Sequence, residues 1–276
     1  MVSMAERDST TRLRRYKNGR LGQETNDRLA CEEPLEIRVE GRTVAITMRT
    51  PGHDEELAAG FLVSEGIIDS SEDLFEVSNC PATAEGGNAV DVLLAGQRVV
   101  DFDRLTRHVF TSSSCGVCGK TTLDSVLREL PPIPSGCSLD PELLLLLPDR
   151  LREDQQTFGR TGGLHASGIF SADGELVVAR EDVGRHNALD KVVGYGLLHR
   201  LLPFSQHILV VSGRVSFELM QKALAAGIPA VVAISAPSSL AVDLARRSGQ
   251  LLAGFVRDGR MNIYAGEERL RPEEKA

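Results

Sequence analysis

The feature that most restricts the fold is a repeated order of strand, loop and helix in the second half of the chain, beyond Pro134. Short apolar runs alternate there with segments of helical periodicity. The predicted strands cover 175–179, 208–211, 230–234, 251–256 and 262–264, and the predicted helices cover 190–199, 216–226 and 240–247. Buried strands that alternate with helices predict an α/β domain whose sheet is covered on both faces.

The first half of the chain has a different pattern. Alternating apolar residues predict a hairpin over 35–39 and 44–48. A helix is predicted over Asp54–Glu65, because acidic residues occupy its first turn and Gly66 follows it. The predicted organisation is a flexible basic arm (1–28), a small α+β domain (29–110), an α/β domain that includes a cysteine loop (111–266) and a charged tail (267–276).

Composition and charge exclude several classes of protein. The net charge is −8, with no Trp and three Tyr, whereas a nucleic-acid surface needs a basic field and usually stacking aromatic residues. The leucine run Leu143–Leu147 lies between two prolines and is too short to span a bilayer. The five cysteines form no disulfide framework and no secretory signal is present. We therefore expect a cytoplasmic protein in a reducing compartment, without membrane or nucleic-acid partners.

A pair of cysteines, Cys115 and Cys118, lies in a loop rich in glycine and serine. The segment Lys120–Leu130 after it has the periodicity of an amphipathic helix. Backbone N–H groups at a helix N-terminus and the Lys120 ammonium both favour a thiolate over a thiol. A thiolate attacks sulfur or binds metal, so this loop is the predicted site of covalent chemistry, and the dipole argument alone favours Cys118.

Two predicted strand-to-helix turns are suited to bind an anion. They are Ser212-Gly213-Arg214 and Ser235–Ser239, where hydroxyl and backbone N–H groups precede a helix. Arg257 and Arg260 flank a glycine turn in the same topology and could bind phosphate oxygens. Together these residues predict a pocket for a diphosphate-bearing ligand. The alternative is that the small residues only make turns and the arginines are solvated.

Two histidines lie among glycines and charged residues. His165 occurs in Thr-Gly-Gly-Leu-His-Ala, and His186 occurs in Gly-Arg-His-Asn. Either ring could orient a ligand, relay a proton or contact the cysteine loop. Each could equally be a structural histidine that bonds a backbone group. His53 fits local turn structure, and no role is predicted for the other three histidines.

Three other readings of the cysteine loop are weaker. Its sequence misses a phosphate-binding loop at the first glycine, and no strand that ends in an aspartate for Mg²⁺ follows. A Cys-x-x-Cys pair is half of many zinc sites, but zinc would need Cys137 or a distant histidine as well. A redox dithiol would normally occur in a thioredoxin-type arrangement near the N-terminus. We expect no resident metal.

Several motifs together resemble the formate dehydrogenase accessory sulfurtransferase (FdhD) family, over about residues 30 to 266. The motifs are Glu65-Gly-Ile-Ile68, Cys115-Gly-Val-Cys118-Gly, Thr161-Gly-Gly-Leu-His165-Ala, Glu181-Asp-Val-Gly-Arg-His186-Asn-Ala-Leu-Asp-Lys191, Val211-Ser-Gly-Arg214 and Gly254-Phe-Val-Arg-Asp-Gly-Arg260. The resemblance implies a cytidine-deaminase-like three-layer α/β/α domain beside a smaller N-terminal α+β domain. It also implies a homodimer.

The resemblance further implies that the protein takes sulfur from a cysteine desulfurase as a persulfide. The sulfur then goes to the molybdenum of bis(molybdopterin guanine dinucleotide), a bound substrate, before formate dehydrogenase receives this cofactor. Cys115 takes the persulfide role and Cys118 is an assisting or resolving thiol. The cofactor contacts implied or predicted are Phe255, Val256, Arg257, Asp258, Gly259, Arg260, Ser212, Arg214, His165 and His186.

One departure from the zinc deaminases is informative. These enzymes use His-x-Glu with a Cys-x-x-Cys, and glutamate is their general acid and base. Here Ser167 follows Ala166 where glutamate would stand, so deamination is not expected. The alternative to a sulfurtransferase is a non-catalytic chaperone that binds the molybdenum cofactor or a guanine nucleotide, with structural or zinc-bound cysteines.

Overall fold

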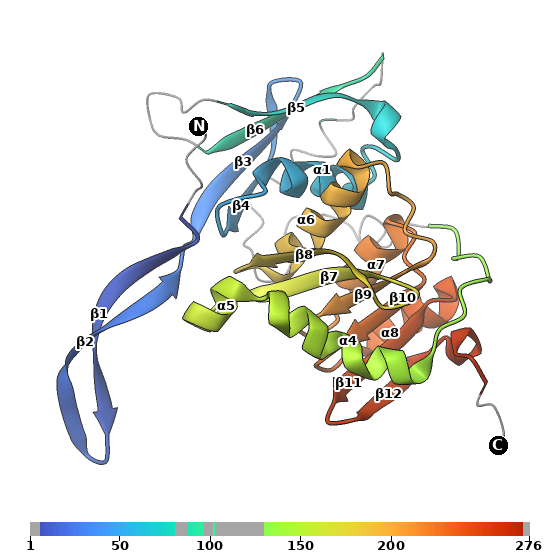
Figure 1. Cartoon of the computed structure of the whole chain (residues 1–276). Coiled ribbons are helices and arrows are strands. Elements are labelled where there is room, and N and C mark those ends of the chain that lie inside the picture. The colour runs from blue at the N-terminus through green and yellow to red at the C-terminus, as the bar shows by residue number, and fades with distance from the viewer. Residues whose placement is uncertain (1–5, 81–87, 97–101, 103–129, 273–276) are drawn as a thin grey trace.

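A six-stranded mixed sheet organises the larger part of the molecule (Figure 1). The computed structural model describes residues 6–80, 88–96, 102 and 130–272. The strand order is β12-β11-β10-β9-β7-β8. Strands β9, β10 and β11 run parallel to one another, whereas β12, β7 and β8 each run antiparallel to their neighbours. Their bounds are β7 His165–Ser171, β8 Leu176–Asp182, β9 His207–Val211, β10 Ala230–Ala233, β11 Leu251–Arg257 and β12 Arg260–Ala265.

Helices cover both faces of this sheet, as its apolar strands predict. One face packs against α4 (Pro141–Asp154), through Leu144, Leu147 and Leu151. The opposite face packs against α6 (Arg185–Leu198), α7 (Phe217–Ala225) and α8 (Ser239–Ser248). Figure 1 shows the three layers that result. The more specific likeness to cytidine deaminases stays a prediction.

Helix α4 is one of the elements that the sequence did not predict. Its N-cap is Asp140, whose carboxylate accepts a hydrogen bond from Glu142 N at 3.0 Å. Pro141 occupies the first turn, where its missing N–H costs nothing. Pro148 lies inside the helix, and a proline within an apolar run usually indicates a break. A six-residue helix, α5 (Gln156–Thr161), follows it.

The small α+β unit has the predicted hairpin and helix. Its sheet has the order β4-β3-β6-β5, and α1 has the predicted bounds Asp54–Glu65 and ends at Gly66 in the left-handed conformation. The core is continuous from this sheet through α1 and α6 to the large sheet. The strands are β3 Glu33–Val39, β4 Arg42–Arg49, β5 Leu74–Cys80 and β6 Ala89–Leu94.

Two glycines let α1 and α6 cross at backbone contact. A Cβ atom on Gly60 would lie 1.8 Å from the Asp190 carbonyl oxygen, and one on Gly194 would lie 1.8 Å from the Glu56 carbonyl oxygen. Neither position can hold a larger residue unless the helices separate. The crossing therefore fixes the small unit against the large one.

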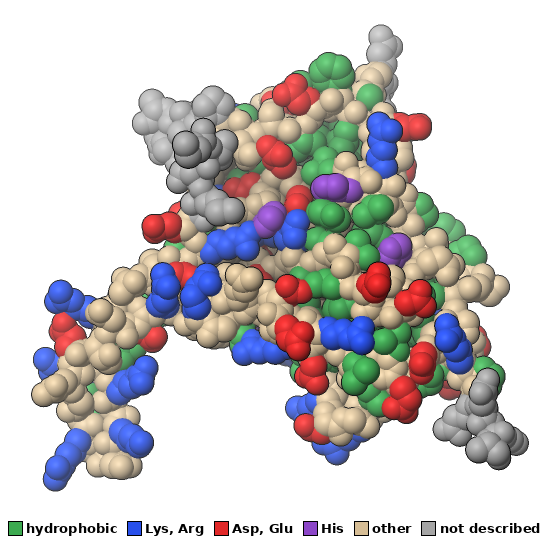
Figure 2. All heavy atoms as spheres, viewed as in Figure 1, with side chains coloured by type: hydrophobic (Ala, Val, Ile, Leu, Met, Phe, Trp, Pro, Cys, Tyr) green, Lys and Arg blue, Asp and Glu red, His purple; other side chains and the backbone are tan. Residues whose placement is uncertain are grey.

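From Asp8 onward the N-terminal arm forms two paired strands, contrary to the expectation of a flexible segment over 1–28. Strands β1 (Asp8–Lys17) and β2 (Arg20–Ala30) form an antiparallel ribbon that projects from the body (Figure 1). Asn18 and Gly19 make its turn with φ values of 54° and 76°, and Asn-Gly is the preferred pair for such a turn. Basic side chains gather along the ribbon (Figure 2). The Asn-Gly pair is the signal in the sequence for this ribbon.

The base of the ribbon and the start of the C-terminal segment are both fixed. Asp8 forms ion pairs with Arg28 at 2.9 Å and with Arg160 at 2.7 Å. Arg269 is only 6% exposed and donates to the carbonyl oxygens of Gly249 and Ile133. The predicted charged tail therefore begins as a docked segment rather than a free one. Within the described residues, no helix is both long and apolar enough to cross a membrane.

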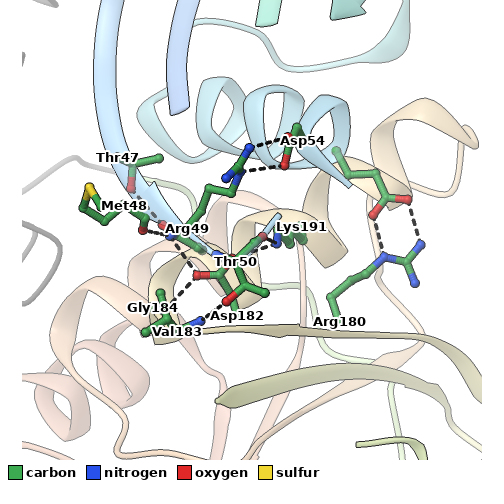
Figure 3. Close-up of polar contacts among 12 residues, drawn as sticks. Thr47, Met48, Arg49, Thr50, Asp54, Arg180, Asp182, Val183, Gly184 and Lys191 are labelled. Carbon is green, nitrogen blue, oxygen red and sulfur yellow. Dashed lines mark hydrogen bonds and ion pairs between the residues drawn. The ribbon is translucent and has the colours of Figure 1, made fainter. Parts of the chain in front are cut away.

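An ion pair across the two units should make their contact sensitive to acid. Arg180 of β8 donates to both carboxylate oxygens of Glu56 in α1, at 2.6 and 2.7 Å (Figure 3). Burial raises the pKa of Glu56, but the hydrogen bonds and charges of Arg180 and, to a smaller extent, His53 outweigh it and lower the pKa from 4.5 to about 2.

Because this pKa is depressed in the folded protein, the stabilisation is complete above pH 4.5 and is lost as the pH falls toward 2. Arg180→Gln is expected to lose roughly 1–3 kcal/mol of unfolding free energy at pH 7, because His53 supplies part of the shift and solvent screens part of the charge. The loss should shrink as the pH falls through this window. Urea unfolding of both proteins measures it, and a difference that does not change with pH would contradict the assignment.

Candidate site at the carboxyl edge of the large sheet

The predicted cysteine chemistry lies outside the described residues. Cys115, Cys118, the predicted strand over 107–110 and nearly all of the predicted helix over 120–130 belong to the segment 103–129. The persulfide role of Cys115 and the assisting role of Cys118 therefore stay predictions. The structure does place all of the other predicted site residues.

Those residues meet at one edge of the large sheet. Strands β9, β10 and β11 are parallel, so the turns that follow them emerge together. Strand β7 runs the other way, so its first residue, His165, lies at the same edge and pairs with Asp182, the last residue of β8. Ser212–Arg214, Ser235–Ser238 and Phe255–Arg260 follow or end the three parallel strands.

His165 belongs to an electropositive group at this edge, which we call the histidine cluster: His165, Arg185, His186, Gly213 and Arg214. A Cβ atom on Gly213 would lie 3.2 Å from His165 Nδ1 and 4.0 Å from Arg185 Cβ, so glycine permits this close contact. The pKa of His165 is lowered, first by burial and then by the charges of Arg185, His186 and Arg214, while the negative charge of Asp182 opposes the change. Arg214 itself is exposed. Such a cluster attracts an anion.

Ser212 and His186 both have structural partners. The Ser212 hydroxyl accepts from Ala166 N at 2.9 Å, and Ser212 N donates to Ala166 O at 3.0 Å. His186 Nε2 lies 3.1 Å from Glu218 Oε2 and 3.3 Å from Ser216 Oγ. These contacts favour the structural alternative for the Ser212 hydroxyl and for one nitrogen of His186.

Two of the anion-suited turns are locked to each other. Val215 N donates to Ala236 O at 3.1 Å, and Ser238 N donates to Val215 O at 2.9 Å. Ser216 and Ser238 are the N-caps of α7 and α8, so their hydroxyls serve the helices, as the turn alternative states. The two turns therefore form one rigid rim along the edge.

The segment Phe255–Arg260, which we call the arginine hairpin, lies at the same edge of the sheet, at the end opposite the histidine cluster. Arg257 and Arg260 face each other across the β11–β12 turn and are exposed. Phe255 has a φ of 53°, rare for an aromatic residue, and its N–H donates to Ser235 O at 3.2 Å. Val256 is 0% exposed in the core, so only its backbone could reach a ligand. Asp258 and Gly259 form the turn itself, both with positive φ.

The histidine cluster and the arginine hairpin are separated along the edge. Strands β7 and β11 are three positions apart in the sheet, which at about 4.8 Å per strand gives about 14 Å. The rim made by the two locked turns lies between them. The edge therefore offers two groups of positive charge that suit an elongated anionic ligand rather than a single phosphate.

The run from Glu181 to Lys191 is mostly structural. The Glu181 carboxylate accepts from Thr157 N and Phe158 N at the start of α5, at 3.0 and 2.7 Å. Asp182 and Lys191 form a buried ion pair at 2.7 Å (Figure 3). Of this run, only Arg185 and His186 belong to the histidine cluster.

The remaining polar residues of this run also bind neighbouring elements. Asn187 Nδ2 donates to Met48 O at 2.7 Å, in the small unit. Asp190 accepts from Ser64 Oγ at 2.7 Å and from Lys222 Nζ at 2.8 Å. The sequence analysis did not single out Arg185 or Glu218. The position of Arg185 beside His186 was the available signal for it.

Cys137, which a zinc site at the cysteine loop could recruit as a further ligand, is not suited to bind metal. This thiol is 4% exposed in the core beneath α4. Burial raises the pKa of Cys137, although Arg269 opposes the change, so the protonated form is favoured and metal ligation is not. In the parts of the chain that the structure describes, no three His, Cys, Asp or Glu side chains gather as a metal site.

Comparison with known proteins identifies the family. Residues 30–271 match the FdhD/NarQ family. A relative from Streptomyces avermitilis, named sulfur carrier protein FdhD, is 54% identical, with 88% of this chain and 89% of that protein covered. A protein of the same name from Mycobacterium tuberculosis is 49% identical, with 88% and 91% covered.

A solved structure agrees with these relatives. The crystal structure of a formate dehydrogenase accessory protein from Desulfotalea psychrophila superposes with a TM-score of 0.77 at 25% identity. The match covers 96% of this chain and 100% of that one. The fold and the site thus define a class: an α/β protein whose large sheet has, at one edge, residues suited to bind an anion. The chain belongs to the FdhD/NarQ family of sulfur carrier proteins linked to formate dehydrogenase.

Proposed function

We propose that this protein carries sulfur from a cysteine desulfurase to the molybdenum of bis(molybdopterin guanine dinucleotide), and so matures formate dehydrogenase. It would do so in the cytoplasm, as a homodimer. The observation that carries the cofactor half of this proposal is the pairing of the histidine cluster with the arginine hairpin along one edge. A guanine dinucleotide is elongated and carries a diphosphate, which suits two separated groups of positive charge.

The chemistry of the sulfur half follows from the two thiols. The Cys115 thiolate attacks the outer sulfur of the donor persulfide, and the thiolate of the desulfurase leaves. The Cys118 thiolate then attacks Cys115 Sγ, so the outer sulfur leaves as sulfide and a disulfide forms between the two cysteines. The two thiols supply both electrons that this step needs. A cellular thiol reductant then restores the pair.

Nucleotide binding tests the cofactor half. Wild-type protein is expected to bind GDP, and Arg257→Ala with Arg260→Ala should weaken binding by roughly 10- to 100-fold, since charge-assisted hydrogen bonds contribute about 1.5–3 kcal/mol. The control variant Arg12→Ala removes one exposed arginine of the ribbon, far in sequence from the arginine hairpin. It should bind GDP as wild type does. Equal affinity of the arginine-hairpin variant and wild type would contradict the assignment.

Binding is also expected to be coupled to protonation of His165. Burial and the neighbouring positive charges lower the pKa of His165, which favours the neutral ring in the free protein. A bound diphosphate cancels positive charge, raises that pKa and causes proton uptake. Calorimetry at about pH 6 in two buffers of different ionisation enthalpy measures this uptake. His165→Gln should show less proton uptake than wild type, and equal uptake would contradict the coupling.

A further inference from the structure

The turn that leads into Arg185 and His186 is held by a residue of the small unit. Val183 N donates to Thr50 Oγ1 at 3.2 Å. Asp182 fixes the same turn from both sides, because its carboxylate accepts from Gly184 N at 2.8 Å and from Thr50 N at 3.1 Å. Figure 3 shows Thr50 beside Asp182, Val183 and Gly184. The path of this turn therefore depends on a residue more than 130 positions earlier in the chain.

Each polar atom of Thr50 forms a hydrogen bond with a residue from another part of the fold. Its side chain is almost fully buried, and the residue is 1% exposed. While the hydroxyl accepts from Val183 N, it donates to Cys31 O at 3.0 Å, at the foot of the ribbon. Its carbonyl oxygen accepts from Lys191 Nζ at 2.8 Å. One residue thus joins the ribbon, the β8–α6 turn and α6.

The position of Thr50 matters because Arg185 and His186 are the first two residues of α6. Their side chains start directly after the Val183–Gly184 turn. A Cβ atom added to Gly213 would lie 4.0 Å from Arg185 Cβ, so Gly213 and Arg185 are closely packed. The histidine cluster therefore leaves little room for the Val183–Gly184 turn to shift. Loss of the hydroxyl would leave Val183 N–H and Cys31 C=O without that partner, and the turn would relax to recover hydrogen bonds.

We propose that Thr50 is a positioning residue for the ligand site: its hydroxyl fixes the Val183–Gly184 turn and so places Arg185 and His186 toward the anionic ligand. This inference rests on the proposed function, because the histidine cluster is its ligand site. Thr50 itself does not touch the ligand. Its effect on affinity is expected only through the residues that the turn carries.

The test compares three variants by GDP affinity and by urea unfolding. Thr50→Val keeps the shape and removes the hydroxyl, and Thr50→Ser keeps the hydroxyl. Thr43→Val is the control, because it removes a hydroxyl of β4, the strand that ends just before Thr50, and this hydroxyl bonds Glu36 within the small sheet. Thr50→Val should weaken GDP binding about tenfold, whereas Thr50→Ser and Thr43→Val should stay within about twofold of wild type. Thr50→Cys, whose thiol is a weak acceptor, is the second variant should Thr50→Val fail to fold.

A double-mutant cycle separates positioning from general destabilisation. In a background of Arg185→Ala with His186→Ala, Thr50→Val should no longer change GDP affinity. A full tenfold effect in that background would overturn the inference, as would wild-type affinity of Thr50→Val alone or a failure of Thr50→Ser to restore binding. If wild-type protein bound no GDP, the proposed function itself would fail. If wild type bound GDP and Thr50→Val bound it equally well, only the role of Thr50 would fail.

Discussion

A Cys115→Ala variant is expected to lose formate dehydrogenase activation by roughly 100-fold or more, because the proposed mechanism forms the covalent persulfide on this thiol. Its affinity for GDP should equal that of wild type, since the predicted nucleotide contacts lie at the carboxyl edge of the large sheet. The measurement is formate dehydrogenase activity in cells that lack the natural protein and carry each variant. Cys118→Ala should accept sulfur and release it slowly, because the resolving thiol is missing.

Two controls make this prediction specific. Cys137→Ser alters a buried core thiol. Cys31→Ser alters a cysteine whose backbone donates to Arg7 O and accepts from Thr50 Oγ1, and these hydrogen bonds do not involve the thiol. Cys31→Ser should activate formate dehydrogenase as wild type does, and Cys137→Ser should lose stability rather than specific activity. Activation by Cys115→Ala at the wild-type level would exclude a Cys115 persulfide. Loss of both activation and GDP binding would make Cys115 a structural residue.

A Lys191→Met variant should lose roughly 3–5 kcal/mol of unfolding free energy. Its ammonium group pairs with Asp182 at 2.7 Å, and the two side chains are 1% and 0% exposed. Removal of Lys191 leaves the Asp182 carboxylate buried with hydrogen bonds but without a counter-charge. Urea unfolding at pH 7 with an unchanged dependence on denaturant would measure the loss.

A surface pair is the matched control for Lys191→Met. Arg12 lies 3.2 Å from Glu24, but these side chains are 78% and 49% exposed, so Arg12→Met should cost at most about 1 kcal/mol. Asp182→Asn combined with Lys191→Met should be more stable than Lys191→Met alone, because the neutral amide removes the buried charge and keeps hydrogen-bonding capacity. A loss below about 1 kcal/mol for Lys191→Met would show that the pair is unimportant for stability.

Local signals predicted the helices whose ends are marked in the sequence. Helix α1 has an acidic first turn and a glycine after its last residue, and α7 and α8 begin at serine caps. Helix α4 was missed because Pro148 interrupts an apolar run that otherwise has no polar face to reveal its period. The ribbon was missed because the nine charged residues of its two strands indicated a flexible segment, and only a single Asn-Gly pair indicated the turn.

Topology predicted the shared edge of the site, but no pattern along the chain could reveal how its residues are held. The anion-suited turns follow parallel strands, so their meeting at one edge follows from the strand order alone. By contrast, the contacts of Thr50 with Asp182 and of Glu56 with Arg180 join residues more than 120 positions apart. The run from Glu181 to Lys191 carries part of the family resemblance, yet most of its polar groups join the two units.

The most direct test of the sulfur-carrier proposal is peptide mass spectrometry after the protein is incubated with a cysteine desulfurase, pyridoxal phosphate and cysteine. The account predicts a thiol-sensitive gain of about 32 Da, one sulfur atom, on the peptide that contains Cys115. The gain should be absent in Cys115→Ala and should persist in Cys118→Ala. A desulfurase that loads a known acceptor but adds sulfur to neither cysteine of this chain would contradict the account and favour a cofactor-binding chaperone.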